Sequence, residues 1–147
     1  MKFIKVRDVK TPSIGTPKSA GIDLYIPNDH PIISIGPRES ALIPSGLKAN
    51  VPENHAFIAF NKSGIATKKN LAVGACVVDE DYQGEIFIHV YNFGDTKIRL
   101  WPGEKIIQCV LIPVNYEDVE IVETEDQLWE GKYSERGEGG FGSTGLK

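Results

Sequence analysis

Hydrophobic and polar residues alternate along most of the chain, and this period of two predicts β-strands rather than helices. In the clearest segment, residues 85–92, the side chains divide between two faces: Ile86, Ile88 and Val90 on one, Phe87, His89 and Tyr91 on the other. The other predicted strands are residues 2–7, 22–26, 32–35, 39–43, 47–51, 55–60, 97–100, 104–114 and 118–122. Many short strands between turn residues indicate an all-β sandwich or barrel.

Two segments depart from this alternation. Residues 63–69 predict the one short helix of the chain, because Ile65, Ala66 and a lysine pair fit one or two helical turns. Residues 134–147 hold five of the fifteen glycines and no hydrophobic face, so this segment by itself should be flexible. We therefore expect a β-domain, residues 1–133, followed by a flexible C-terminal arm, residues 134–147.

The composition of the arm suits either a disordered end or a ligand-binding segment. Phe141 lies among the glycines, and Arg136, Ser143 and Thr144 flank it. Glycines let a backbone approach a ligand closely, Phe can stack on a ring, and Arg can bind a phosphate. Composition alone leaves both possibilities open.

The overall composition is that of an ordinary folded protein. A chain of 147 residues suits one domain, and 41% hydrophobic with 24% charged residues is typical of a folded chain and not of a disordered one. The net charge of −4 argues against a protein that coats nucleic acid, although local cations or a metal can still hold a small anion. No apolar stretch approaches the ~20 residues of a membrane span.

The two cysteines cannot build a disulfide framework. Cys76 and Cys109 each lie in an apolar run without metal-ligand spacing, so both are expected to be buried, reduced thiols. Residues 1–10 lack the apolar stretch of a signal peptide. The expected compartment is a reducing cytoplasm, or its viral or organellar equivalent.

Two short segments could bind an anion or a metal. Asp23 closely follows Gly21 near the start of a strand, where a solvated turn is the more common explanation. Lys62, Ser63 and Gly64 open the predicted helix, so a cation, a hydroxyl and backbone N–H groups could meet a phosphate there. Capping of the helix by Ser63 is the simpler explanation.

Two polar residues stand out beside apolar runs. Asp79 directly follows such a run in a predicted β-hairpin, so its carboxylate could project from the rigid end of a strand. This position suits a general base or a ligand in the shell of a metal, and Tyr82 could press against a sugar. Gln108 lies in a very apolar strand, and a buried amide needs partners, either backbone groups or a ligand.

Several catalytic classes lack their sequence signals. The chain has no P-loop, no dinucleotide-binding fingerprint, no serine-hydrolase elbow and no zinc-deaminase motif. Its three histidines are scattered, and His89, in the middle of a strand, is expected to be structural.

Five segments, in order, resemble the five motifs of the trimeric dUTPase family over essentially the whole chain. They are residues 20–24 (motif 1), 61–66 (motif 2), 74–84 (motif 3), 103–108 (motif 4) and 136–145 (motif 5). Motif 3 carries Val-Val-Asp-x-x-Tyr-x-Gly, and motif 5 reads Arg-Gly-Glu-Gly-Gly-Phe-Gly-Ser-Thr-Gly. Motif 2 usually has Arg where this chain has Lys62, which keeps the charge but loses the bidentate fork.

The resemblance implies a jelly-roll-like β fold assembled as a homotrimer. Each active site would combine motifs 1, 2 and 4 of one chain, motif 3 of a second and the arm of a third. The implied reaction is hydrolysis of dUTP to dUMP and pyrophosphate with Mg²⁺, which keeps uracil out of DNA and supplies dUMP for thymidylate synthesis. The implied partners are dUTP and two further copies of the chain, without stable nucleic-acid or membrane binding.

The resemblance also implies a role for each matched residue. Asp79 would activate the water that attacks the α-phosphorus, and Asp23 would hold the water shell of a Mg²⁺ ion bound mainly by the triphosphate. The backbone of Ala75 and Val78 would recognise uracil, and Tyr82 would pack under the deoxyribose. The remaining substrate-binding residues contact phosphates or, for Phe141, stack on uracil: Lys62, Ser63, Gly64, Gln108, Arg136, Phe141, Gly142, Ser143 and Thr144.

Three other classes of protein remain as alternatives. A dCTP deaminase resembles dUTPases in fold and shares parts of these motifs, but residues 79–84 are more typical of a dUTPase. A nucleotide-switched regulatory binding protein would keep the nucleotide site as a switch. A structural β protein, such as a capsid-type jelly roll, has no use for the arm motif.

Overall fold

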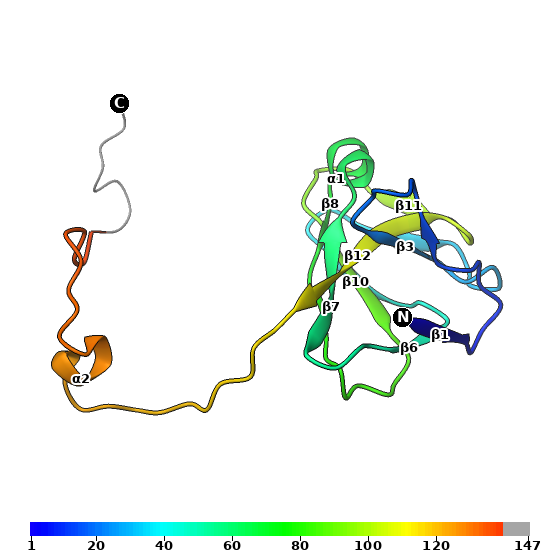
Figure 1. Ribbon diagram of the computed structural model, residues 1–147. Helices are drawn as coiled ribbons and strands as arrows, with labels where there is room; N and C mark the ends of the chain where they lie inside the picture. Colours follow the sequence, from blue (N-terminus) through cyan, green and yellow to red (C-terminus); the bar gives the residue numbers. More distant parts are fainter. Residues whose placement is uncertain (140–147) are drawn as a thin grey trace. The chain divides into compact units, whose positions relative to one another are not determined.

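The alternating segments of the chain form β-strands close to the predicted bounds (Figure 1). The computed structural model describes residues 1–139. Its strands are β1 (Lys2–Lys5), β2 (Ser13–Ile14), β3 (Ile22–Tyr25), β4 (Ile33–Ile35), β5 (Ser40–Pro44), β6 (Leu47–Asn50), β7 (His55–Asn61), β8 (Leu71–Val73), β9 (Val77–Val78), β10 (Phe87–Asn92), β11 (Ile98–Leu100) and β12 (Lys105–Pro113). Of these, β2 and β8 are not among the predicted strands.

The strands pair antiparallel in several small sheets. A five-stranded sheet has the order β2–β3–β12–β7–β9, and a three-stranded sheet has the order β5–β10–β8. Two further sheets are the pairs β1–β6 and β11–β4. This all-β, jelly-roll-like arrangement confirms the predicted fold class.

The hydrophobic core follows the alternation read from the sequence. Along β10 and the residue pair before it, Ile86, Ile88 and Val90 are at most 3% exposed, whereas Phe87 and Tyr91 on the other face are exposed. Phe57 of β7 and Leu24 of β3 are completely buried in the same cluster. Burying each such side chain contributes roughly 1.5–3 kcal/mol, so the core stabilises the strand pairing that positions the site.

The segment around Asp79 differs from the predicted β-hairpin. β9 pairs with β7 in the five-stranded sheet, whereas β10 pairs with β5 and β8 in the three-stranded sheet. The prediction was wrong because a short local turn between two apolar runs is typical of a hairpin, while the actual partners lie far apart in sequence. Residues 79–84 therefore form a turn that connects two sheets.

The helix predicted at residues 63–69 is confirmed as α1 (Ser63–Lys69), which follows β7 directly. It ends at Asn70, whose positive φ of 50° is a left-handed conformation that Asn tolerates better than most residues. No helix of residues 1–139 is long and apolar enough to cross a membrane.

A second unit begins at Tyr116, and it corrects two predictions. It contains an additional helix, α2 (Glu125–Trp129), which starts with a capping box between Thr124 and Gln127. The predicted strand at residues 118–122 is wrong, because this stretch pairs with no strand of the described chain and leaves Val119 95% exposed. The predicted arm, residues 134–147, lies within this second unit, and its separate role stays a prediction.

Candidate active site

Asp23 is a buried acid held by two lysines. It lies in β3, beside Gln108 of the neighbouring strand β12, and its side chain is only 5% exposed. Lys62 donates a hydrogen bond to Oδ1, and Lys105 donates one to Oδ2 at 2.9 Å. Burial raises the pKa of the Asp23 carboxyl, but the hydrogen bonds from the two lysines outweigh it and bring the pKa below its usual value. Asp23 is therefore an ionised buried group, not the solvated turn residue that is the commoner explanation.

The cluster carries one negative and two positive charges, so a net positive charge remains. The Lys62 side chain is 23% exposed and the Lys105 side chain 49% exposed, so both cations reach the surface. The hydrogen bond to Asp23 raises the pKa of Lys105, which keeps the ammonium charged. This arrangement suits an anionic ligand.

Lys105 is a site residue that the sequence analysis missed. A strict alternation along β12 would place it on the same face as Ile107, away from Gln108. The pairing of β12 with β3 shifts register between Lys105 and Ile107, and this β-bulge turns Lys105 toward Asp23. Its place in motif 4 was the available signal, but a bulge cannot be located from the sequence alone.

Ser63 is the first residue of α1 and does not cap it. The N-cap position belongs to Lys62, and no side chain makes the capping hydrogen bond. The capping explanation for Ser63 is therefore wrong. A side chain added at Gly64 would meet nothing within 4 Å, so the space beside this residue is open.

Gln108 is oriented by a backbone partner and a glycine. Its Nε2 donates to the carbonyl of Asn61 at 2.9 Å, so among the described residues the partner of this amide is a backbone group. A Cβ on Gly21 would lie 2.4 Å from Oε1 of Gln108, so only glycine leaves room for the amide in this position. Motif 1 thus shapes the position of the motif 4 side chain.

Residues 75–82, which include β9 and are called the 75–82 loop below, line a cavity of about 180 Å³. Four of the predicted site residues belong to its lining: Ala75, Val78, Asp79 and Tyr82. The hydroxyl of Tyr82 donates to the carbonyl of Glu85 at 2.8 Å and fixes the ring across the turn. A Cβ on Gly84 would lie 2.4 Å from this hydroxyl, so the ring lies directly against the glycine.

Both cysteines line this cavity without being bonded to each other. Cys109 is buried as predicted, and burial raises the pKa of its thiol to about 12, so it is neutral. Cys76 is only half-buried, which corrects the prediction for this residue. The buried residues of the lining, Ile86, Ile107 and Cys109, therefore form an apolar and uncharged surface.

Asp79 is the charged group at the rim of this cavity. It follows β9 directly and is exposed, as its place after an apolar run predicts. Within residues 1–139 no hydrogen bond to its carboxylate is formed, whereas its backbone carbonyl accepts from the N–H of Tyr82 at 3.3 Å. The carboxylate is thus free to accept a proton from a ligand or a water.

The Asp23 cluster and the Asp79 cavity lie on opposite faces of the five-stranded sheet. Ile107 and Cys109 of β12 line the cavity, whereas Gln108 between them sits beside Asp23. Successive side chains of a strand point to opposite faces of a sheet. The Asp23 cluster and the cavity that Asp79 borders are therefore separate features within one copy of the chain.

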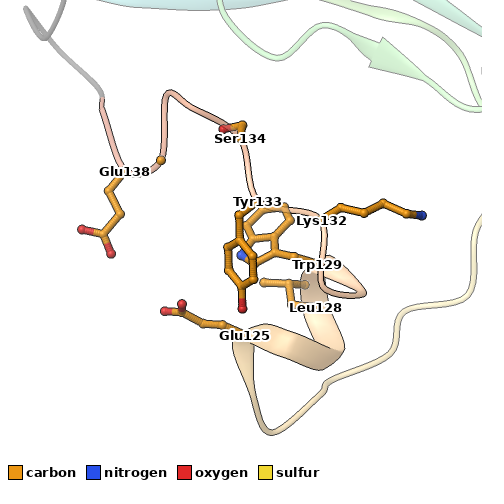
Figure 2. A pocket seen from close by; sticks show the side chains of 8 residues that line it. Glu125, Leu128, Trp129, Lys132, Tyr133, Ser134 and Glu138 are labelled. Atoms are coloured by element: carbon orange, nitrogen blue, oxygen red, sulfur yellow. The ribbon is translucent and has the colours of Figure 1, made fainter.

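The second unit holds the first residue of motif 5 and a separate cavity. Arg136 Nε donates to the carbonyl of Gly139 at 2.7 Å, and the rest of the predicted arm site lies outside the described residues: Phe141, Gly142, Ser143 and Thr144. A cavity of about 470 Å³ is lined by side chains of α2 and the residues after it, including Trp129 and Tyr133 (Figure 2). No sequence pattern predicts this cavity.

Comparison with known proteins identifies the family. Residues 7–145 match the family model for dUTPase. The deoxyuridine 5'-triphosphate nucleotidohydrolase of Mus musculus is 35% identical over 146 residues, which cover 99% of this chain and 85% of that protein. The protein of the same name from Polynucleobacter necessarius is 39% identical over 145 residues, covering 96% of this chain and 91% of the relative. The chain belongs to the dUTPase family.

Solved structures agree in fold. A mutant dUTPase of Staphylococcus bacteriophage 80alpha with dUpNHpp superimposes with a TM-score of 0.85 at 21% identity, covering 99% of this chain and 98% of that one. A mutant dUTPase of phage phi11 of S. aureus, described with a structural Mg(II) ion, has a TM-score of 0.75 at 17% identity, covering 84% of this chain and 96% of that one.

Proposed function

We propose that this chain hydrolyses dUTP to dUMP and pyrophosphate, the activity that its relatives carry in their name. The product dUMP would serve thymidylate synthesis, and removal of dUTP would keep uracil out of DNA. The reducing compartment expected from the sequence, the cytoplasm or its viral or organellar equivalent, is part of this proposal.

The observation that carries the mechanism is the separation of the site over two faces of one sheet. Asp23 and its lysines lie on one face, and the Asp79 cavity opens on the other. A nucleotide that needs both must bind where the first face of one copy meets the second face of another. This supports a homotrimer with shared active sites, in which the arm of a third copy covers the ligand.

Catalysis would use Asp79 as the general base. Its exposed carboxylate takes a proton from a water, and the resulting hydroxide attacks the α-phosphorus while the bond to the bridging oxygen of pyrophosphate breaks. The rigid end of β9 fixes the carboxylate in place, and in-line attack on a polyanion depends mainly on such positioning. The absence of a hydrogen bond to the Asp79 carboxylate among residues 1–139 leaves the lone pairs of that carboxylate for this role.

Phosphate binding would fall to the net positive cluster around Asp23. Lys62 and Lys105 share the carboxylate, so Asp23 orients both ammonium groups before the ligand arrives. The hydroxyl of Ser63, which does not cap α1, and the amide of Gln108 would supply further contacts, and the space beside Gly64 would let a phosphate approach the backbone. Two lysines that share one carboxylate offer a reason why Lys62 can replace the usual Arg.

Magnesium fits this site when it arrives with the nucleotide. Within residues 1–139 no three His, Cys, Asp or Glu side chains gather in a way that could hold a metal ion. Magnesium commonly keeps several waters and binds through one or two carboxylates together with substrate phosphates. Asp23 would hold the water shell, and the ion would supply positive charge to the phosphates. Both Asp23 oxygens already accept from lysines, which favours contact through water.

Specificity for uracil and deoxyribose would come from the 75–82 loop. Ala75 and Val78 line the cavity, and their backbone groups would pair with the uracil edge. A fixed backbone rejects a base with the wrong donors, and a tight loop excludes the methyl group of thymine. Tyr82, held against Gly84, would pack under the sugar and exclude a 2′-hydroxyl.

The arm would complete the site. Arg136 would reach the γ-phosphate, Ser143 and Thr144 would help to bind the phosphates, and Phe141 would stack on uracil, with Gly142 allowing the close approach. Such a segment loses conformational entropy when it becomes ordered on the ligand, so closure of the arm would depend on the bound nucleotide.

The proposal is tested by pyrophosphate release from a panel of deoxynucleoside triphosphates with magnesium. We expect rapid release from dUTP, and rates from dCTP, dTTP and UTP lower by at least about a hundredfold, as expected when a site built for polar recognition loses its pairing. Ammonia released from dCTP would instead identify a deaminase, and binding of dUTP without turnover would favour a regulatory protein.

A further inference from the structure

His89 links β10 to the beginning of the 75–82 loop. Its Nδ1 accepts a hydrogen bond from the N–H of Ala75 at 3.0 Å, and its backbone carbonyl accepts from the N–H of Gly74 at 2.9 Å. The side chain is half-buried on the outer face of β10, and β8 pairs with that strand (Figure 1). The sequence predicts only a structural role for this residue.

The imidazole lies directly on the glycine of motif 3. A Cβ on Gly74 would lie 2.1 Å from Nδ1 and 2.6 Å from Cε1 of His89, which no side chain could tolerate. Glycine is required here because the ring occupies the place of a side chain. His89 and Gly74 therefore form one packed unit at the entrance of the loop.

Residues 74–76 cross from one sheet to the other, and each is tied differently. Gly74 continues the pairing with β10 through its N–H. The carbonyl of Cys76 accepts from the N–H of Ala59 in β7 at 2.8 Å. Ala75 lies between these two attachments, and within residues 1–139 the partner of its N–H is the imidazole of His89. The position of Ala75 thus depends on that ring.

We propose that His89 is a positioning residue for the nucleobase pocket, acting through Ala75. The neutral imidazole holds the start of the 75–82 loop, so that the backbone groups lining the cavity keep fixed positions for the base. This inference rests on the proposed function and deepens it. It assigns base binding, not the chemical step, as the property that His89 controls, because the ring bonds to Ala75, whereas His89 is not among the residues that line the cavity with Asp79.

The attachment requires an acceptor atom on the side chain at position 89, because Nδ1 of His89 receives the hydrogen bond from the N–H of Ala75.

The test compares two variants that differ in one property. In His89→Val the acceptor is lost, whereas in His89→Asn the amide oxygen can replace Nδ1. For His89→Val we expect KM for dUTP to rise about tenfold with kcat unchanged, which corresponds to the loss of one useful hydrogen bond. For His89→Asn we expect KM near the wild-type value. His30 is also half-buried, and its Nδ1 bonds to the carbonyl of Pro31, so His30→Asn serves as the matched control and should change neither constant.

The KM comparison decides the proposal. An unchanged KM in His89→Val, or equal KM values for the Val and Asn variants, would each overturn it.

A measurement that does not depend on catalysis separates this inference from the proposed function. Hydrogen exchange of the Ala75 amide should be slow in the wild type and in His89→Asn, and faster in His89→Val. If the wild type releases no pyrophosphate from dUTP, the proposed function fails, while the exchange rates still decide whether His89 holds Ala75. Fast exchange of Ala75 in the wild type would contradict the attachment itself.

Discussion

At the scale of single residues, two aspartates of this chain have opposite surroundings. Asp23 is buried and accepts hydrogen bonds from two lysines, so both oxygens of its carboxylate hold ammonium groups in place. Asp79 is exposed at the end of a strand, and its carboxylate accepts no hydrogen bond from residues 1–139. Environment assigns different roles to chemically identical groups, and here it favours Asp79 as the proton acceptor.

This assignment predicts the effect of Asp79→Asn. The amide keeps the size of the side chain but cannot take a proton, so we expect kcat to fall about a thousandfold while KM changes little. Pyrophosphate release and titration with a non-hydrolysable dUTP analogue measure the two quantities. Asp81→Asn, in the same turn, is the control and should keep full activity. Normal turnover by Asp79→Asn would rule out this residue as the general base.

At the scale of elements, local patterns predict strands well and their partners poorly. Alternation places the buried face of β10 correctly, and the helix predicted at residues 63–69 is present as α1. The pairing of β9 with β7 and the bulge that turns Lys105 toward Asp23 depend on contacts between distant segments. The attachment of Ala75 to His89 has the same origin. Motifs therefore identify the candidate site residues, whereas the second lysine and the histidine emerge from the sheet arrangement.

A contact between elements also predicts a pH dependence of stability. Arg7, after β1, donates two hydrogen bonds to Glu85, before β10, and the N–H of Gly46 donates a third. The hydrogen bond from Arg7 lowers the pKa of Glu85 below its usual value. A lowered pKa means that the contribution is fully present above the unfolded pKa of about 4.3 and is lost as pH falls through the folded value.

We therefore expect Glu85→Gln to lower the free energy of unfolding by about 1 kcal/mol at pH 7, and by much less near pH 3. Urea unfolding at the two pH values and one protein concentration measures the difference. Glu53→Gln, on an exposed turn, is the control. An equal loss at both pH values would show that the side chain acts through packing and not through its charge.

At the scale of the whole molecule, the sheet arrangement separates the two predicted parts of the site, and this separation is the basis of the proposed sharing of sites between copies of the chain. The cation cluster and the Asp79 cavity occupy opposite faces of one sheet, so each copy can contribute to two different sites. Beyond Asn115 the chain forms a second unit that leaves apolar side chains such as Val119 and Ile121 exposed. Exposed apolar side chains in a row suit burial against another copy.

The separate role of residues 134–147 leads to the last prediction. Their composition gives no hydrophobic face, and the core of the first unit is formed without them. A chain ending at Tyr133 should therefore fold and form the same oligomer as the full chain, yet lose most dUTP turnover, by about a hundredfold or more, because the closing contacts are absent. Analytical ultracentrifugation, thermal unfolding and pyrophosphate release measure the three properties. Phe141→Ala in the full chain separates stacking from the rest of the arm and should raise KM by about tenfold, as loss of base stacking costs roughly 1–3 kcal/mol. Because the deletion leaves the first unit intact, unfolding of the shortened chain would mean that the arm is structural, and full activity would mean that the site closes without it.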